Sequence, residues 1–241
     1  MKTSNKIIAL IFGLLILIPA LVVATIIIKY KSGNFTRLDV KSGMITQTFP
    51  GIKNITLRDL RSLYIIPSDS LYAEVTTNEN YQPVKFNIQG DAVLIYADSV
   101  RFNGNNPRNN NEQDYQRRQN SVWLYLPAAY TAMIENCGIT LSTDGKKAEP
   151  EGINLQLINS SINDDIIDSS GVRFRKLTIT GDRSLIGFGS HFQAGEMDLS
   201  LKNKSTLDIS TSNIGNLMLN ADSSTSIHLS GQQLNSVIQK K

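Results

Sequence analysis

The sequence predicts an all-β protein in which a single-chain β-solenoid follows one N-terminal transmembrane helix. Three observations lead to this prediction. An uncharged segment of 22 residues, 7–28, lies near the start of the sequence. Short segments that alternate between apolar and polar residues follow it, and pairs of aliphatic residues then recur about every ten residues. No window outside 7–28 keeps apolar residues at helical spacing for the length that a helix needs.

Residues 7–28 have the length and composition of a membrane-spanning helix. At about 1.5 Å per residue they extend roughly 33 Å, enough for a hydrocarbon core of about 30 Å. A cleaved signal peptide is the alternative, but its apolar region usually has about 7–15 residues. We therefore expect 1–6 to be a short tail and 7–28 an uncleaved, single-pass signal anchor in the inner membrane. The short tail and long remainder favour a body in the periplasm or on the cell exterior.

The composition argues against several classes of function. Of the 24 lysines and arginines, Lys2 and Lys6 precede the body, which leaves 22 basic against 21 acidic residues. A nucleic-acid-binding protein needs a concentrated basic footprint, so we expect no nucleic-acid partner. The single cysteine, Cys137, excludes an intrachain disulfide and a zinc site built on cysteines. We expect Cys137 to be a small buried residue, and His191 and His228 to be solvated.

The segments after the anchor have the pattern of short strands. We expect 29–50 to form a linker and a first strand, with 35–40 as that strand, and 51–241 to form the solenoid. The expected strands each hold four to six residues, are rich in β-branched or aromatic side chains, and are bounded by turn residues. In the first half of the body they are 60–65, 71–75, 84–88, 92–96 and 122–126.

An asparagine-rich segment, 103–120, interrupts this order. It contains seven asparagines and no aliphatic residue, so it lacks the apolar surface needed to offset its ordering entropy. We expect a flexible surface insertion between two strands. The alternative is a loop in which Arg108, Arg117 and Arg118 contact a polyanion, but charged low-complexity loops are usually just solvated.

The second half of the body carries a repeat of two aliphatic or aromatic residues separated by one. Both side chains of such a pair point to the same face of a strand. Two units per coil give a coil of about twenty residues, and hairpin signals such as Asn-Gly or Asp-Gly are absent from connections of the repeat such as 202–205 and 221–226. We also expect stacked serines and asparagines to form hydrogen-bonded ladders, and the polar segment 231–241 to cap the last coil. The pairs are 177 and 179, 186 and 188, 197 and 199, 207 and 209, 217 and 219, and 227 and 229.

One cluster of charged residues could carry chemistry. Carbohydrate-active enzymes need carboxylates or a metal cluster beside a base. The candidates are Asp164, Asp165 and Asp168, followed by Arg173, Arg175 and Lys176. We interpret them as an acidic turn that opens a strand with solvated basic residues. The sequence therefore assigns no catalytic, cofactor-binding or metal-binding residue, and predicts no cofactor.

Several segments together resemble a known bacterial family. They are the leading apolar segment, the opening strand Phe35–Val40, the segment Gly90–Ile95, the strand Val122–Leu126 running into Pro127, and the serial strands punctuated by serine and glycine. Across roughly Phe35 to Gln233 the sequence resembles the auto-transporter adhesin head GIN domain family, common in the envelopes of Bacteroidota. The resemblance implies a right-handed β-helix in the cell envelope, with adhesion suggested by the family's name and no catalytic residues.

These observations favour a non-catalytic, membrane-anchored envelope protein that acts as a scaffold or as an adhesion or binding module. Its expected partners are the membrane and an envelope protein or glycan. The first alternative is a carbohydrate-active β-helix enzyme that acts on an acidic glycan, although a fold alone does not confer a reaction. The second is an assembly module whose solenoids stack end to end.

Overall fold

The computed structural model describes residues 43–98, 118–143, 152–164, 171–234 and 237–238. The expected tail 1–6, anchor 7–28 and first strand 35–40 lie outside these residues. Within the described part of the chain, no helix has the length and apolar character needed to cross a membrane.

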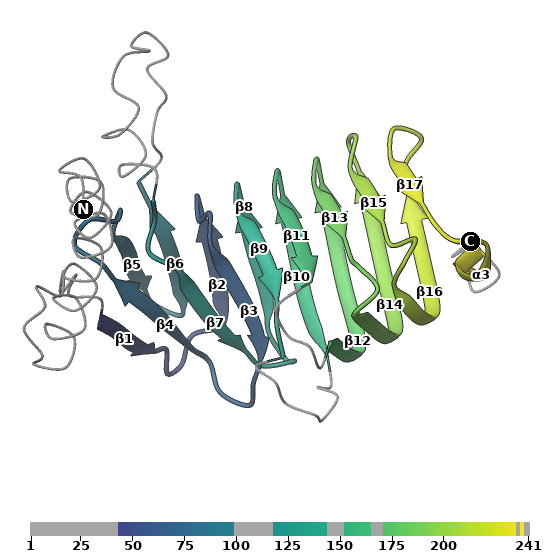
Figure 1. Cartoon of the computed structure of the whole chain (residues 1–241). Helices are drawn as coiled ribbons and strands as arrows, with labels where there is room; N and C mark the ends of the chain where they lie inside the picture. The colour runs from purple at the N-terminus through teal and green to yellow at the C-terminus, as the bar shows by residue number, and fades with distance from the viewer. Residues whose placement is uncertain (1–42, 99–117, 144–151, 165–170, 235–236, 239–241) are drawn as a thin grey trace, which may run out of the picture. The chain divides into compact units, whose positions relative to one another are not determined.

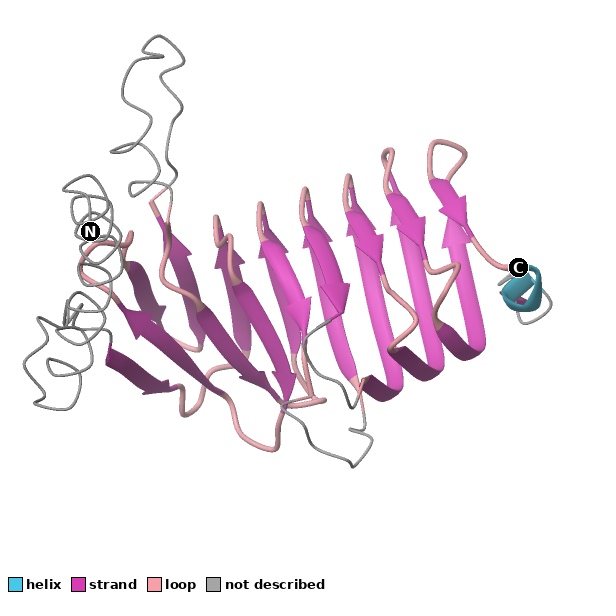
Figure 2. Cartoon of the chain, in the orientation of Figure 1, coloured by secondary structure: helices cyan, strands magenta, loops and turns pink. Residues whose placement is uncertain are grey.

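The body consists of two nine-stranded sheets, which confirms the all-β prediction (Figure 1). Figure 2 shows strands along the whole body, with α3 (Gly231–Leu234) at its C-terminal end. Sheet A contains, in spatial order, β1 (Gly43–Thr48), β4 (Tyr72–Thr77), β7 (Val122–Leu126), β3 (Leu63–Pro67), β9 (Gly138–Leu141), β11 (Ser161–Asp164), β13 (Leu185–Gly187), β15 (Thr206–Asp208) and β17 (Ser226–His228). Sheet B contains β18 (Val237–Ile238), β16 (Asn213–Ala221), β14 (Phe192–Lys202), β12 (Val172–Asp182), β10 (Ile153–Ile158), β8 (Thr131–Glu135), β2 (Asn54–Arg58), β6 (Ala92–Ala97) and β5 (Val84–Gln89).

Successive strands stack in parallel, as the repeat predicts. In sheet B, Leu177 pairs with Met197, and Met197 pairs with Leu217. The three positions are 177, 197 and 217, so one coil takes 20 residues here. In sheet A, Leu207 pairs with Ile227 at the same step. The solenoid and its coil of about twenty residues are therefore confirmed.

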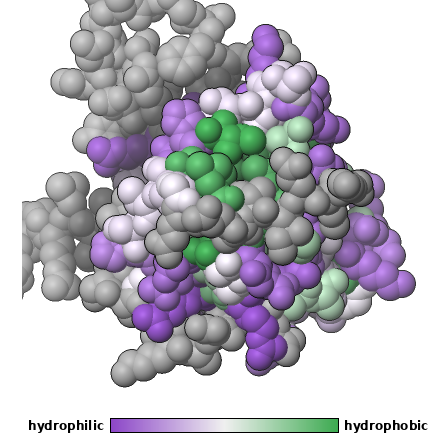
Figure 3. Space-filling view, turned by 90° about the vertical axis from the view of Figure 1, so that its right-hand side faces the viewer, coloured by the Kyte–Doolittle hydropathy of each residue, from purple (hydrophilic) through white to green (hydrophobic). Residues whose placement is uncertain are grey.

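The paired aliphatic residues of the repeat fill one interior. Met197, Leu207 and Leu217 are each 0% exposed, and they belong to a single hydrophobic core. Ile227 was expected in the same interior but is 38% exposed, so that part of the prediction was wrong. Its strand, β17, is the last in the order of sheet A, and no further described strand of that sheet covers it. Figure 3 shows this end of the body, with hydrophobic residues gathered in the middle and hydrophilic residues around them.

The N-terminal end of the body departs from a simple succession of coils. β2 lies between β6 and β8, and β3 lies between β7 and β9, so the first coil of the sequence is not the first in space. β4 pairs antiparallel with β1 and β7, and β5 pairs antiparallel with β6. The sequence predicted a solenoid over 51–241 without distinguishing this end from the rest. Antiparallel strands complete both sheets there.

Most of the predicted insertion, 103–120, lies outside the described residues, but its last three residues, 118–120, do not. Gln119 and Asn120 are buried, with 8% and 5% of their surface exposed. The Gln119 side chain accepts a hydrogen bond from the Arg61 backbone N–H at 2.6 Å. The Asn120 side-chain oxygen accepts one from the Asn78 N–H at 2.8 Å. At these two residues the prediction of a solvated loop was wrong, because their amides bind neighbouring backbone groups.

The corner that leads from sheet B to sheet A uses left-handed backbone and stacked amides. Asp59, Asn136, Asn159 and Asn203 occupy these corners with φ values of 57°, 55°, 49° and 56°. Asparagine and aspartate tolerate this conformation better than other non-glycine residues. The side-chain amide of Asn159 donates to Asn136 at 2.7 Å, and that of Asn136 donates to Asp59 at 3.2 Å. The expected asparagine ladder therefore exists at the corners.

A second ladder runs inside the same corners. The backbone N–H of Cys137 donates to Ser160 Oγ, that of Ser160 to Ser184 Oγ, and that of Ser184 to Ser205 Oγ, at 3.1–3.3 Å. All four residues are buried, and each hydroxyl also donates to a nearby backbone carbonyl. The Leu60 N–H donates to Cys137 Sγ at 3.3 Å, so this thiol occupies a position that serine fills in later coils.

Candidate functional site

The two sheets differ in charge. The described strands of sheet A contain no lysine or arginine, and every cation of the described strands lies in sheet B. The sheet B cations are Arg58, Lys85, Arg173, Arg175, Lys176 and Lys202. Several of them form exposed ion pairs, such as Arg58 with Glu135 at 2.8 Å. The outer face of sheet B is therefore a solvated, charged surface of the ordinary kind. Sheet A is unusual because its described strands contain no lysine or arginine.

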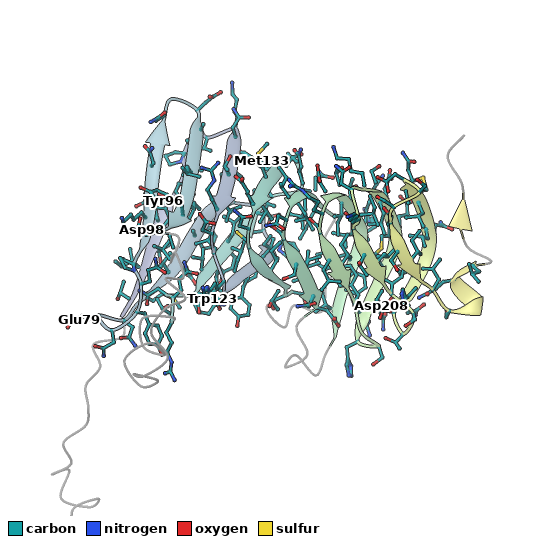
Figure 4. All side chains as sticks on the ribbon, turned by 90° about the horizontal axis from the view of Figure 1, so that it is seen from above. Glu79, Tyr96, Asp98, Trp123, Met133 and Asp208 are labelled. Carbon is teal, nitrogen blue, oxygen red and sulfur yellow. The ribbon has the colours of Figure 1, made fainter. Side chains whose placement is uncertain are left out.

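The outer face of sheet A carries one continuous row of side chains, which we call the sheet A row. Strand pairing places them side by side, while the neighbouring residues of each strand are buried, with the exception of Ile227. In spatial order the row is Glu74, Trp123, Tyr64, Thr140, Asn163, Gly187, Asp208 and His228. Figure 4 shows Trp123 and Asp208 on one side of the body and Met133 of sheet B on the other.

One end of the sheet A row is aromatic. The rings of Tyr64 and Trp123 stack with centroids 5.2 Å apart and an interplanar angle of 9°. Tyr72 and Tyr125 stack beside them at 4.1 Å and 7°. The Tyr125 hydroxyl donates to Glu74 at 3.2 Å, which fixes this end further. Aromatic stacks on neighbouring strands form a rigid, amphipathic surface.

Next to these rings the row forms an open groove of about 810 Å³. Its floor consists of Tyr64, Thr140, Asn163, Gly187 and Asp208. Residues 188–191, which connect β13 to β14, form one wall. The described residues that line the groove include carboxylates, hydroxyls, an amide, an imidazole and the rings of Tyr64 and Phe188, but no lysine or arginine.

Asp164 holds the wall of the groove in place. Its side chain is buried, and Oδ1 accepts a hydrogen bond from the Gly189 backbone N–H at 2.9 Å. Phe188, which directly precedes Gly189, is buried, and its ring stacks on that of Phe192 with the centroids 4.1 Å apart. The wall is therefore fixed by one hydrogen bond and one ring stack, and Asp164 has a positioning role.

Asp208 supplies a fixed negative charge on the floor. The Ser210 hydroxyl donates to its Oδ1 at 2.9 Å, and the Ser210 N–H donates at 3.3 Å. These hydrogen bonds hold the pKa of Asp208 below its ordinary value, and the bond from the Ser210 hydroxyl has the largest effect. The charge interaction with His228 lowers the pKa further. At neutral pH the groove therefore offers an ionised acceptor.

The structure does not bring together the charged cluster considered in the sequence. Asp164 lies at the groove, whereas Arg173, Arg175 and Lys176 lie on β12 in sheet B. Asp165 and Asp168 lie outside the described residues. Among the described residues no group of three or more histidine, cysteine or acidic side chains is placed to hold a metal.

Apart from Asp164, which the sequence analysis singled out, the groove residues were not identified as candidates from the sequence, although Tyr64 and Trp123 stood in expected strands. The alternation of apolar and polar residues along each strand placed Tyr64 and Trp123 on the polar face of their strands. It did not show which strands would be neighbours in the sheet. The two histidines, in contrast, are exposed as predicted: His191 in a turn at the groove wall, and His228 on β17.

Cys137 behaves as the sequence predicts, as a small buried residue with 4% of its surface exposed. Burial raises the pKa of its thiol to about 12. The hydrogen bond from the Leu60 N–H acts in the opposite direction but is the smaller effect. In the native protein we expect no reaction with a thiol reagent at pH 8 beyond the rate of unfolding. In urea the same thiol should react at once.

The raised pKa also predicts a loss of stability in alkali. Above the ordinary thiol pKa of about 9 the unfolded chain releases this proton, while the folded chain keeps it up to about 12. Ionisation then favours the unfolded state, so the free energy of unfolding falls as pH rises through this range. Cys137→Ser should remove this part of the pH dependence, because serine is the ladder residue of the later coils. Equal alkaline profiles for both proteins would contradict the assignment.

No protein-family model matches the sequence, and comparison with curated proteins finds no match. Three solved structures resemble the chain at 12% identity, each over 83% of its length. They are a candidate cell adhesion protein from Clostridium sporogenes ATCC 15579 (TM-score 0.32, 100% of that chain), a candidate adhesin from Parabacteroides merdae ATCC 43184 (0.30, 93%) and a candidate lipid-binding protein from Parabacteroides distasonis ATCC 8503 (0.31, 97%).

Proposed function

We propose that this protein is a non-catalytic, membrane-anchored binding module of the cell envelope, and that it binds its ligand on the outer face of sheet A. The difference between the two sheets carries the proposal. Sheet B carries six cations in its described strands, four of which form exposed ion pairs, whereas sheet A combines stacked aromatic rings with an open groove and has no lysine or arginine in its described strands. Half-buried aromatic side chains such as Tyr64 and Trp123, beside a concave polar surface, are typical of a binding site.

The geometry favours binding over catalysis. A hydrolytic site needs two groups at working distance from one bond, with different proton affinities. At this groove Asp164 is buried and hydrogen-bonded to the wall, and Asp208 is hydrogen-bonded to Ser210. Both carboxylates thus have structural hydrogen bonds, and we assign neither of them an acid or base role.

The anchor and the location of the body rest on residues 1–28 of the sequence. An uncharged segment of 22 residues followed by a β-solenoid favours a single pass, with the body in the periplasm or on the cell surface. A role in adhesion is what the resemblance to the head GIN domain family implies. Protease treatment of intact and opened cells, with carbonate extraction of membranes, tests both points. A body that stays protected until the inner membrane is opened, or a chain released by carbonate, contradicts the proposal.

A matched pair of substitutions tests the binding face. Thr140 lies on the groove floor in sheet A, and Thr178 is an equally half-buried outward residue of sheet B. We expect the full chain, solubilised in mild detergent, to co-sediment with isolated envelope material from the producing cells. Thr140→Arg should abolish co-sedimentation by filling the groove, and Thr178→Arg should leave it unchanged.

Two results would contradict this proposal. Equal co-sedimentation of both variants would show that the outer face of sheet A is not the binding face. Release of soluble fragments from the envelope material by the wild-type chain, but not by Thr140→Arg, would show an enzyme acting at the groove. Matched circular dichroism spectra for the two variants exclude a folding defect as the cause.

A further inference from the structure

We propose that the ligand of the groove is an uncharged glycan chain, whose first sugar ring stacks on Tyr64 and continues the Trp123–Tyr64 stack. The inference rests on the proposed function, and it adds the chemical class of the ligand and its position. Three features of the sheet A row support it: the direction of the ring stack, the small residues beside it, and the distribution of charge.

The ring stack points along the row and ends at the groove. Neighbouring strands lie about 4.8 Å apart. The Tyr64 and Trp123 centroids are 5.2 Å apart with nearly parallel planes, so the rings stack from strand to strand. One face of the Tyr64 ring meets Trp123, and the opposite face is directed towards β9. There the next residue of the row is Thr140, which is too small to continue the stack.

A pyranose ring matches the space beside Tyr64. Such a ring has an apolar face of C–H groups and a rim of hydroxyls. The C–H face packs against the negative face of an aromatic ring, and the hydroxyls need hydrogen-bonding partners at the sides. Asn163 on the floor and Ser190 on the wall supply both donors and acceptors, and Asp208 supplies an ionised acceptor.

The groove suits a chain of sugars better than a single one. Its floor crosses β3, β9, β11, β13 and β15, which are four strand spacings, or about 19 Å. A peptide would gain most by pairing with the backbone at a sheet edge. The groove lies on the face of the sheet, where side chains rather than free backbone groups are offered. An extended oligosaccharide uses such a face along its whole length.

The charges of the described groove residues select against acidic glycans. Among the residues that the structure describes, those lining the groove include Asp164 and Asp208 but no lysine or arginine, and Glu74 stands further along the row. A uronic acid or sulfated sugar would bring like charges together without a lysine or arginine among the described lining residues to compensate them, which is unfavourable. This argues against the acidic-glycan enzyme considered in the sequence analysis.

Trp123 provides a direct probe, because it is the one tryptophan of the chain. We would titrate the full chain in detergent with neutral polysaccharides (β-glucan, mannan and xylan) and with acidic ones (polygalacturonate and hyaluronan), following tryptophan fluorescence. At least one neutral polysaccharide should change the emission in a saturable way. Adding 0.5 M salt should leave that response in place, because no ion pair contributes to it.

Two tyrosines form the matched control. Tyr64 stacks at the groove, whereas Tyr96 is a half-buried outward residue of sheet B with Lys85 near its ring. Tyr64→Ala should weaken binding roughly tenfold through the loss of one ring contact. Tyr64→Phe should retain most of the affinity, and Tyr96→Ala should leave it unchanged. Equal losses for Tyr64→Ala and Tyr96→Ala would overturn the proposal.

The outcomes separate this inference from the proposed function. A response to acidic polysaccharides alone, weakened by salt, overturns the uncharged glycan and leaves the binding face intact. A lack of response to every polysaccharide, together with retained co-sedimentation that Thr140→Arg abolishes, shows that the groove binds another class of envelope ligand. Loss of co-sedimentation in the wild type as well removes the proposed function itself.

Discussion

Replacing Phe192 by alanine is expected to lower the free energy of unfolding by about 3–5 kcal/mol. Phe192 is 0% exposed and lies where the groove wall joins the core. Its ring stacks on Phe188 at 4.1 Å and contacts Phe174 with centroids 6.0 Å apart. Truncation removes a large buried surface and leaves a cavity between two other rings, which the surrounding coils cannot fill.

Urea unfolding of the full chain in detergent, followed by circular dichroism, measures this effect. Leu185→Ala is the matched control, because Leu185 is a large aliphatic residue of the preceding strand with 49% of its surface exposed. We expect that change to stay within about 0.5 kcal/mol of the parent. Similar unfolding midpoints for Phe192→Ala and the parent would show that the ring stack is not part of a closed core. Phe192→Ala should also weaken ligand binding, since Phe188 would lose its support.

Replacing Gly215 by alanine is expected to destabilise the protein by about 1–3 kcal/mol, although glycine-to-alanine changes in extended chain usually stabilise by about 0.4–1 kcal/mol. A methyl group at Gly215 would lie 2.7 Å from the carbonyl oxygen of Gly195 in the coil below. A methyl at Gly195 would in turn lie 2.9 Å from the carbonyl oxygen of Arg175. These contacts are with backbone, so relief requires the coils to move apart.

Gly187→Ala is the control for this prediction. The nearest heavy atom to a methyl group there is Asn163 Oδ1 at 3.6 Å, which is an ordinary contact. We expect that variant to be as stable as the parent or slightly more stable. Thermal unfolding of the two variants under the same conditions gives the comparison. A stabilised Gly215→Ala protein would mean that the coils at β14 and β16 are less tightly stacked than described.

Where adjacent coils were also adjacent in sequence, the sequence predicted the structure well. Met197, Leu207 and Leu217 showed a fixed spacing, and the structure places all three inside one core. The serine ladder and the burial of Cys137 followed from the same stacking. A repeat makes such features predictable because each coil meets a near copy of itself.

The neighbours of the N-terminal coils could not be predicted in this way. β2 pairs with β6 and β8, and β3 pairs with β7 and β9, so these strands meet partners that lie far apart in the sequence. No repeat links these segments, and alternation alone does not select a partner. The burial of Gln119 and Asn120 depends on the same pairing, because their amides bind backbone groups of other strands.

The sequence by itself determined the all-β class, the length of a coil, and which side of each later strand is apolar, because spacing along the chain fixes these properties locally. The tertiary structure decided that Trp123, Tyr64, Thr140, Asn163 and Asp208 stand in one row, and that the cations of the described strands gather on the opposite sheet. The physical reason is that a groove across strands depends on the order and register in which the strands pair. Backbone hydrogen bonds, which any residue except proline can complete, do not encode that order residue by residue.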